Sequence, residues 1–244
     1  MRERLVLLGT GTCQLQTDRR ASSVLIELDG LRVVYDMGRG IADRLAELGL
    51  RQDDIQHIVL SHFHPDHLSD LIPYLQAASW SRMDPRSLDL HIYGPPGLEV
   101  QLMRLLSLFD PGVLVRETFR VHLHEIRAEA LEIQGYRWTF EDLPPAGNRG
   151  LKFERRQRVY ALTGDSSFHE QEVEFLRGVD TAVIDSGHLD EDEIVALAAR
   201  SNAGRIICSH VYQELDAAAL QRRAEDRGFR GTLEMGQDLM EVLL

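Results

Sequence analysis

The sequence has few cysteines, no long apolar run and no excess of positive charge. Only two cysteines, Cys13 and Cys208, occur in the chain, which is too few for a disulfide framework. No segment approaches the ~20 apolar residues of a membrane span. The apolar stretch near the start ends at Gly9 and indicates a strand, not a signal peptide. We therefore expect a cytoplasmic protein with no membrane partner.

The charge balance restricts the class of partner. Acidic residues outnumber basic ones, and the formal net charge is −12 at pH 7. Because nucleic acid is normally bound by a basic face, this balance argues against an extended nucleic-acid surface. A short nucleic-acid end entering a metal-lined cleft is not excluded, since bound divalent cations are the largest local charges in such a site.

The hydrophobic pattern alternates between strand and helix along the whole chain. No internal repeat, low-complexity tract or flexible linker interrupts it, so a single domain over residues 1–244 is expected. Strand-rich stretches punctuated by helices, twice over, predict an α+β fold: a four-layer αββα sandwich with two mixed sheets face to face. The pattern predicts strands at 4–8, 23–28, 31–35, 56–60, 90–93, 181–185, 205–208 and 232–234, several more between 120 and 162, and helices at 40–48, 68–77, 97–108, 171–177, 191–200 and 216–227.

Residues 61–67, which read Ser-His-Phe-His-Pro-Asp-His, are the most informative stretch. His62 and His64 are two apart, so their rings fall on one side of an extended chain. Pro65 is expected to fix a turn that brings Asp66 and His67 to an adjacent point. Imidazole and carboxylate are ligands for zinc, manganese or iron. Surface histidines on a loop are the alternative, but this pattern arises by chance roughly once per thousand such sequences.

Two later apolar runs end in further ligand types. The run 159–162 leads through Thr-Gly to Asp165, and the run 205–208 leads through a serine to His210. A strand with Asp or His at its tip repeats the arrangement of the first cluster, and loops at strand ends often carry such sites. We therefore expect both residues to join a metal site. Isolated histidines are expected to be ordinary surface or core residues: His57, His91, His122 and His169.

These residues resemble the metallo-β-lactamase superfamily, over nearly the whole chain. Residues 8–12, the Ser22-Ser23 pair and residues 35–38 are similar to the start of the ribonuclease Z-like branch, which includes small cyclic phosphodiesterases. The resemblance implies the metallo-β-lactamase type of αββα fold. It also implies zinc as cofactor, with two ions expected or one, and manganese or iron as alternatives. A homodimer is common in the family.

The resemblance implies a role for each candidate ligand. The first two histidines of the cluster serve one metal, and Asp66 and His67 serve the other. Asp165 bridges both, His210 completes the second site, and the acid at Asp36 supports the metal-binding loops. The full ligand set that the resemblance implies is His62, His64, Asp66, His67, Asp165 and His210.

The catalytic residues implied by the resemblance are Asp66, Asp165 and His188. His188 stands before a predicted helix, like the histidine of a His-x-Thr-like motif that approaches the scissile phosphate, although Asp190 replaces the threonine. Asp185 could orient it. The alternative is that His188 or Asp190 only caps the helix.

One family histidine is absent. Pro145 or Ala146 stands at its place, and neither can bind a metal. Water, Asn148 or Asp142 are the candidate substitutes. Three outcomes stay open: a two-metal enzyme with an opened first site, a one-metal enzyme that uses the second site, and a degenerate non-catalytic protein.

The resemblance implies a metal-dependent hydrolase, best matched by a phosphodiesterase for a small or nucleotide-like substrate. A lactone or thioester hydrolase is the alternative. Members of the family that process transfer RNA carry a glycine-rich basic arm, and nothing after Leu90 has that composition. The basic run 149–158 could meet an anionic substrate, but a solvated hairpin is the expected structure.

Overall fold

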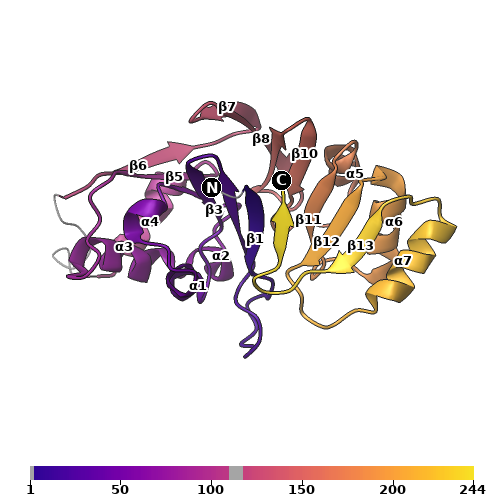
Figure 1. The fold of residues 1–244 in the computed structure, drawn as a ribbon, viewed down its shortest axis with the longest axis horizontal. Coiled ribbons are helices and arrows are strands. Elements are labelled where there is room, and N and C mark those ends of the chain that lie inside the picture. Colours follow the sequence, from indigo (N-terminus) through magenta and orange to yellow (C-terminus); the bar gives the residue numbers. More distant parts are fainter. Residues whose placement is uncertain (1–2, 110–117) are drawn as a thin grey trace. The chain divides into compact units, whose positions relative to one another are not determined.

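The computed structural model describes residues 3–109 and 118–244, which divide into two compact units. The first unit comprises Met1–Gly9, Gln16–Ile126 and Asp238–Leu243, and the second comprises Thr10–Leu15, Arg127–Gln237 and Leu244. Figure 1 follows the chain through the elements of both units. None of the helices in the described ranges has the length and apolar character needed to cross a membrane.

The described part of the first unit contains a seven-stranded mixed sheet in the order β14-β1-β2-β3-β4-β5-β6. Pairing is antiparallel from β14 to β3 and parallel from β3 to β6. The strands are β1 (Arg4–Gly9), β2 (Ser23–Leu28), β3 (Leu31–Tyr35), β4 (His57–Val59), β5 (Leu90–Gly94), β6 (Val121–Glu125) and β14 (Glu241–Leu243). The helices are α1 (Ile41–Glu47), the 3-10 helix η1 (Gln52–Asp54), α2 (Pro65–Leu68), α3 (Leu71–Trp80) and α4 (Leu98–Leu106).

The core of the first unit joins the sheet to its helices. Leu8 and Val34 on the strands belong to one buried cluster with Ile41 of α1, Leu71 of α3 and Leu98 of α4. Each fully buried aliphatic side chain stabilises the fold by about 1.5–3 kcal/mol. This packing holds the ends of β3 and β4 in place, where the chain leaves the sheet and the polar residues begin.

In the second unit, the described residues form a seven-stranded mixed sheet in the order β13-β12-β11-β10-β9-β8-β7. Strands β10 to β13 are parallel, and β7 to β10 are antiparallel. The strands are β7 (Glu129–Ile133), β8 (Tyr136–Leu143), β9 (Asn148–Arg155), β10 (Arg158–Leu162), β11 (Thr181–Asp185), β12 (Arg205–Ser209) and β13 (Thr232–Met235). The helices are α5 (Glu170–Leu176), α6 (Glu191–Ser201) and α7 (Ala217–Asp226), which share a buried core with β10, β11 and β12.

The predicted strands and helices are confirmed, apart from differences near the histidine cluster and at the C-terminus. Pro65 does not fix a turn but begins α2, because its restricted φ suits the first helical position. The helix expected at 68–77 instead begins at Leu71 and ends at Trp80. Strand β14 was not predicted, since three residues are too few to show an alternating pattern.

Candidate metal centre

The first imidazole cluster lies in the first unit, where the chain leaves β4 and enters α2. The His62 ring centroid lies 4.4 Å from that of His64 and 4.3 Å from that of His67. Asp66 Oδ2 is 3.9 Å from His67 Nε2. The local fold therefore gathers three imidazoles and one carboxylate, the donor types that bind zinc.

Asp36 holds this cluster in place. Its carboxylate is 2% exposed and accepts hydrogen bonds from Ser61 N at 2.7 Å, Ser61 Oγ at 2.8 Å and His67 Nδ1 at 2.8 Å. The residue adopts a left-handed φ of 67°, and its backbone N–H donates to Val59 O at 2.8 Å. One carboxylate thus ties together the beginning and the end of the histidine segment.

These hydrogen bonds select the nitrogen that each ring offers. Because the Ser61 hydroxyl donates to Asp36, its oxygen accepts from His62 Nδ1, at 2.9 Å. His67 Nδ1 is likewise used as a donor to Asp36. Both rings therefore present Nε2 as the ligand atom, which is the usual way in which a partner on one ring nitrogen orients a metal-binding histidine.

Gly38 permits the close approach of the two chain segments. A Cβ atom at this position would lie 1.6 Å from Asp66 O, so any side chain would displace the cluster. The neighbouring Met37 N donates to His67 O at 2.8 Å. Glycine is required here by contact between backbones, since only a residue without Cβ allows it.

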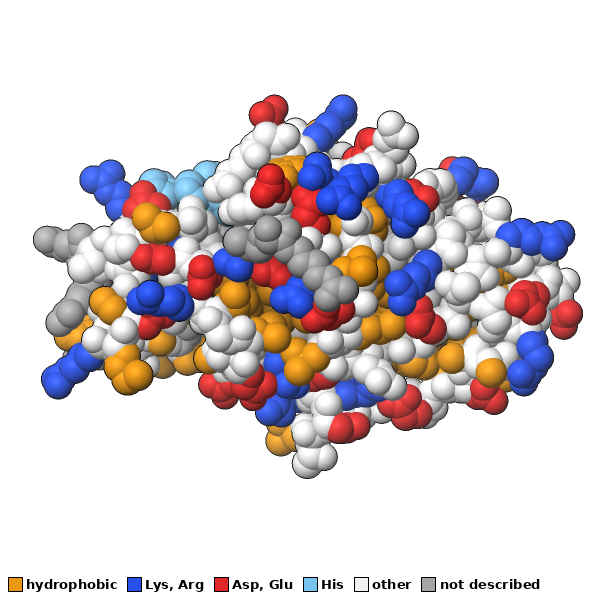
Figure 2. All heavy atoms as spheres, in the orientation of Figure 1, with side chains coloured by type: hydrophobic (Ala, Val, Ile, Leu, Met, Phe, Trp, Pro, Cys, Tyr) orange, Lys and Arg blue, Asp and Glu red, His pale blue; other side chains and the backbone are white. Residues whose placement is uncertain are grey.

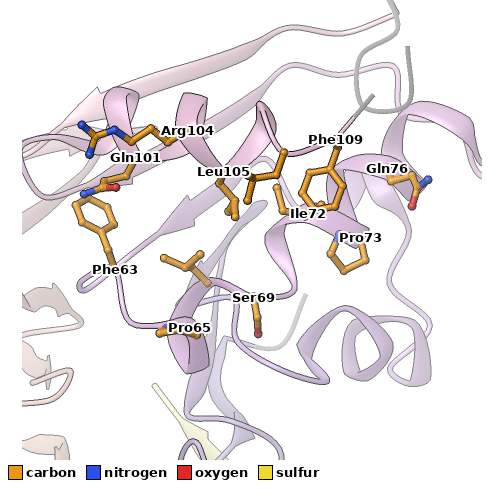
Figure 3. A pocket seen from close by; sticks show the side chains of 12 residues that line it. Phe63, Pro65, Ser69, Ile72, Pro73, Gln76, Gln101, Arg104, Leu105 and Phe109 are labelled. Atoms are coloured by element: carbon orange, nitrogen blue, oxygen red, sulfur yellow. The ribbon is translucent and has the colours of Figure 1, made fainter. Parts of the chain in front are cut away.

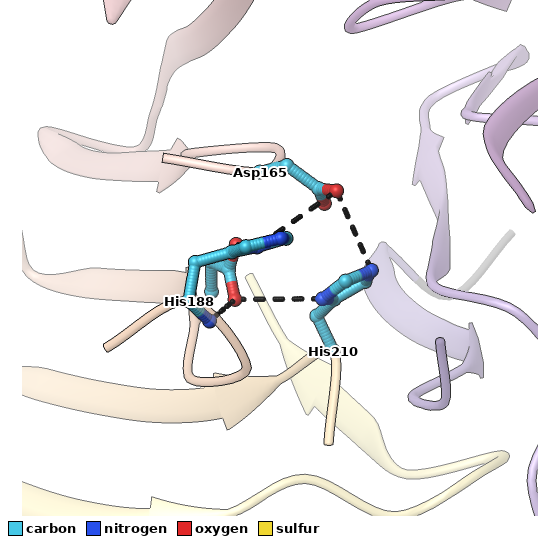
Figure 4. A group of neighbouring side chains, drawn as sticks. Asp165, His188 and His210 are labelled. Atoms are coloured by element: carbon cyan, nitrogen blue, oxygen red, sulfur yellow. Dashed lines mark hydrogen bonds and ion pairs between the residues drawn. The ribbon is translucent and has the colours of Figure 1, made fainter. Parts of the chain in front are cut away.

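The second cluster belongs to the second unit and follows three neighbouring parallel strands. Asp165 comes after β10, Asp185 ends β11, and His210 follows β12, while His188 lies on the loop after β11. Their ligand atoms all lie within 4.8 Å of one another (Figure 4). The carboxyl ends of parallel strands meet at one edge of a sheet, which is why residues so distant in sequence converge.

Asp185 organises the second cluster. His188 Nδ1 donates to Asp185 Oδ2 at 2.6 Å, and this hydrogen bond raises the pKa of His188. Asp185 Oδ1 accepts from Gly187 N at 2.6 Å and lies 3.5 Å from His210 Nδ1. His210 Nε2 lies 3.4 Å from Asp165 Oδ2, and the His188 and His210 rings stack with centroids 5.1 Å apart. Of the two residues considered as helix caps, Asp190 forms the N-cap of α6 with Glu193, and His188 does not cap the helix.

The segment that lacks the family histidine is a turn between β8 and β9. Pro145 and Ala146 are exposed there. Asp142, one of the residues considered as a replacement ligand, forms an ion pair with Arg149, so its carboxylate already has a partner. Asn148 is 2% exposed and donates from Nδ2 to Thr163 O at 2.9 Å, whereas its Oδ1 has no hydrogen-bond partner within the described ranges. Of these two candidate substitutes, Asn148 is therefore the one with a side-chain oxygen that is unpaired among the described residues.

The basic run 149–158 forms a β-hairpin, as expected, but it is not solvated throughout. Arg149 is 5% exposed and forms an ion pair with Asp142. The Lys152 ammonium lies 4.4 Å from the centroid of the Phe175 ring, a cation–π distance. Part of this run therefore stabilises the second unit and is not at the surface to meet a substrate.

A row of histidines on β4, β5 and β6 was missed as a group. His91 Nδ1 lies 3.0 Å from His124 Nε2, and the His91 ring stacks on those of His57 and His122. Histidine side chains are visible at the surface in Figure 2. Burial lowers the pKa of His57 to about 4. The repeated His-x-Tyr and His-x-His spacing on adjacent parallel strands was the available signal, because alternate residues share a face.

A family model described as "Beta-lactamase superfamily domain" matches residues 31–226. The ribonuclease Z of Pyrococcus abyssi is 30% identical over 157 residues, which are 63% of this chain and 48% of that protein. The match thus spans about half the length of this archaeal relative.

Solved structures with the same fold include the following two. YhfI from Bacillus subtilis, a metallo-β-lactamase fold protein, aligns with a TM-score of 0.81 at 17% identity and covers 99% of each chain. A diphosphatase from the PhnP family aligns with a TM-score of 0.76 at 20% identity, over 100% of this chain and 98% of its own. The predicted fold class, an α+β fold of the metallo-β-lactamase type with two mixed sheets, is confirmed. The chain belongs to the β-lactamase superfamily of metallo-β-lactamase fold proteins.

Proposed function

We propose that this protein is a metal-dependent hydrolase of phosphodiesters and that residues 1–244 act as one domain. The observation that carries the proposal is the orientation of His62 and His67, whose Nδ1 atoms bind Ser61 and Asp36 so that Nε2 is offered to a metal. Imidazole and carboxylate donors fit zinc, with manganese or iron as alternatives. The proposed ligands are His62, His64, Asp66, His67, Asp165 and His210.

The residues of the second cluster suit acid–base chemistry. A bound zinc ion would lower the pKa of a coordinated water and stabilise charge on phosphate oxygens. Asp165 would accept a hydrogen bond from the nucleophile. His188 is held by Asp185 at Nδ1, which favours the protonated ring and leaves Nε2 to donate to the departing oxygen. Asn148 Oδ1 would take the place of the absent family histidine as a neutral oxygen donor.

The substrate is proposed to be small or nucleotide-like. The net charge of −12 and the absence of a glycine-rich basic arm in the sequence oppose an extended nucleic-acid surface. Proteins similar to this chain include a ribonuclease Z and a diphosphatase, and both names refer to hydrolysis at phosphorus. We therefore propose a small-molecule phosphodiester as the substrate, without a membrane partner.

Hydrolysis of bis-p-nitrophenyl phosphate, with a lactone assayed in parallel, tests the proposal. Zinc- or manganese-loaded protein should cleave the phosphodiester, and a chelator should abolish the activity. His67→Ala should lower the rate more than about 100-fold, because it removes a ligand together with its orienting bond. His169→Ala, at the exposed N-cap of α5, is the matched control and should retain full activity.

Metal analysis by mass spectrometry completes the test. Two equivalents per chain support the two-metal enzyme, and one equivalent that is lost in His210→Ala but kept in His62→Ala supports the one-metal enzyme. Metal-loaded protein that cleaves only the lactone would replace the phosphodiesterase proposal. Inactivity on both substrates would indicate the degenerate, non-catalytic protein.

A further inference from the structure

The first unit contains an apolar groove that is lined in part by Phe63 and Pro65 of the histidine segment (Figure 3). Its volume is about 790 Å³, within the range of about 300–1,000 Å³ that small-molecule sites occupy. Helices α2, α3 and α4 supply most of its lining.

One wall of the groove is the histidine segment itself. Phe63 stands between His62 and His64 in the sequence, and Pro65 immediately precedes Asp66. The Phe63 side chain also packs against the buried core of the unit, which restrains it. A molecule in the groove would therefore contact the segment that carries the proposed metal ligands.

The polar groups of the groove are few and of distinct types. Gln76 and Gln101 offer amides, which both donate and accept hydrogen bonds. Arg104 offers a guanidinium that has no ion pair or side-chain hydrogen bond within residues 3–109 and 118–244. Phe63 and Phe109 add two aromatic rings. This set matches a flat aromatic ligand with hydrogen-bonding edges and a negative charge.

The same set is a poorer match for an aliphatic chain. Such a chain would use Leu68, Ile72 and Leu105 but would give Arg104 no counter-charge and the two amides no partner. A nucleotide has a flat base for the rings, polar edges for the amides and phosphate for the guanidinium. Base–aromatic stacking contributes about 1–3 kcal/mol for each base.

We propose that this groove binds the nucleobase of a nucleotide-containing phosphodiester, with Phe63 as the stacking surface and Arg104 as the anion contact. The assignment rests on the proposed function, since it names the substrate class of that hydrolase. It adds Phe63, Gln101 and Arg104 as residues that determine specificity.

Binding to metal-free protein tests the groove without any catalytic step. Calorimetry in chelator compares AMP, ribose 5-phosphate and octyl phosphate. AMP should bind about 10-fold or more tighter than ribose 5-phosphate, because only AMP carries a base. Gln101→Ala and Arg104→Ala should each weaken AMP binding, whereas Arg222→Ala on exposed α7 should not. Equal binding of AMP and ribose 5-phosphate, or tighter binding of octyl phosphate, would overturn the proposal.

Two esters with the same leaving group separate this proposal from the proposed function. Thymidine 5′-p-nitrophenyl phosphate should be cleaved with a kcat/KM about 10-fold or more above that of methyl p-nitrophenyl phosphate, because stacking of the base is available only to the first. Arg104→Ala should reduce that ratio, and Arg222→Ala should preserve it. Cleavage of both esters at equal efficiency refutes the groove assignment but keeps the hydrolase. Cleavage of neither ester refutes the hydrolase, and the AMP measurement then decides the groove by itself.

Discussion

Glu172→Gln is expected to stabilise the protein at pH 8.5 and to leave its stability nearly unchanged at pH 4.5. Glu172 lies on α5 with 0% of its surface exposed, and Ser166 Oγ donates a hydrogen bond to its Oε1. Burial raises the pKa of this carboxyl to about 8. The folded protein therefore keeps Glu172 protonated at neutral pH, while the unfolded chain ionises it near its ordinary pKa of 4.5.

The direction of the effect follows from proton linkage. Between pH 4.5 and 8 the folded state holds a proton that the unfolded state releases, so the free energy of unfolding decreases as the pH rises. Over that window the loss amounts to about 5 kcal/mol for this one group, at about 1.4 kcal/mol for each pH unit. Glutamine stays neutral in both states and has no such loss.

Denaturant unfolding in chelator at several pH values between 4.5 and 8.5 measures the difference between variant and wild type. The gap should widen steadily with pH. Glu174→Gln is the matched control, because Glu174 lies on the same helix but is exposed. Parallel curves for Glu172→Gln and wild type would show that Glu172 is ionised in the folded protein.

Asp36→Asn is expected to lower both the stability of the first unit and the affinity of the protein for metal. The carboxylate accepts hydrogen bonds from Ser61 N, Ser61 Oγ and His67 Nδ1. The amide nitrogen of an asparagine side chain is itself a donor, so it cannot accept a hydrogen bond from these groups. Loss of two charge-assisted hydrogen bonds at a buried site costs about 3–5 kcal/mol. Metal affinity should fall about 10–100-fold, since His67 loses the partner that orients its ring.

Chemical unfolding in chelator measures the first effect, and competition with a chromogenic zinc chelator measures the second. Asp29→Asn, in the exposed turn between β2 and β3, is the control and should match wild type in both. If stability falls while zinc affinity stays unchanged, then Asp36 supports the fold and His67 is not a metal ligand.

Local pattern alone determined most of the elements and the candidate ligands. The hairpin of β2 and β3 follows from alternation around Asp29-Gly30, and its register pairs Val24 with Tyr35. The His-x-His-x-Asp-His segment was recognisable because its ligand types are adjacent in the chain. Asp165 and His210 were recognisable because each lies within a few residues of the end of an apolar strand.

Only the tertiary structure decided the partners of those residues. Asp36 reaches His67 because β3 pairs with β4. Asp142 pairs with Arg149 across the neighbouring strands β8 and β9. The groove beside Phe63 exists only where α2 and α3 meet α4. The protonation of Glu172 likewise depends on its burial. Spacing in the sequence reports which face of an element is apolar, but hydrogen bonds, ion pairs and pKa values depend on distances between segments far apart in the chain.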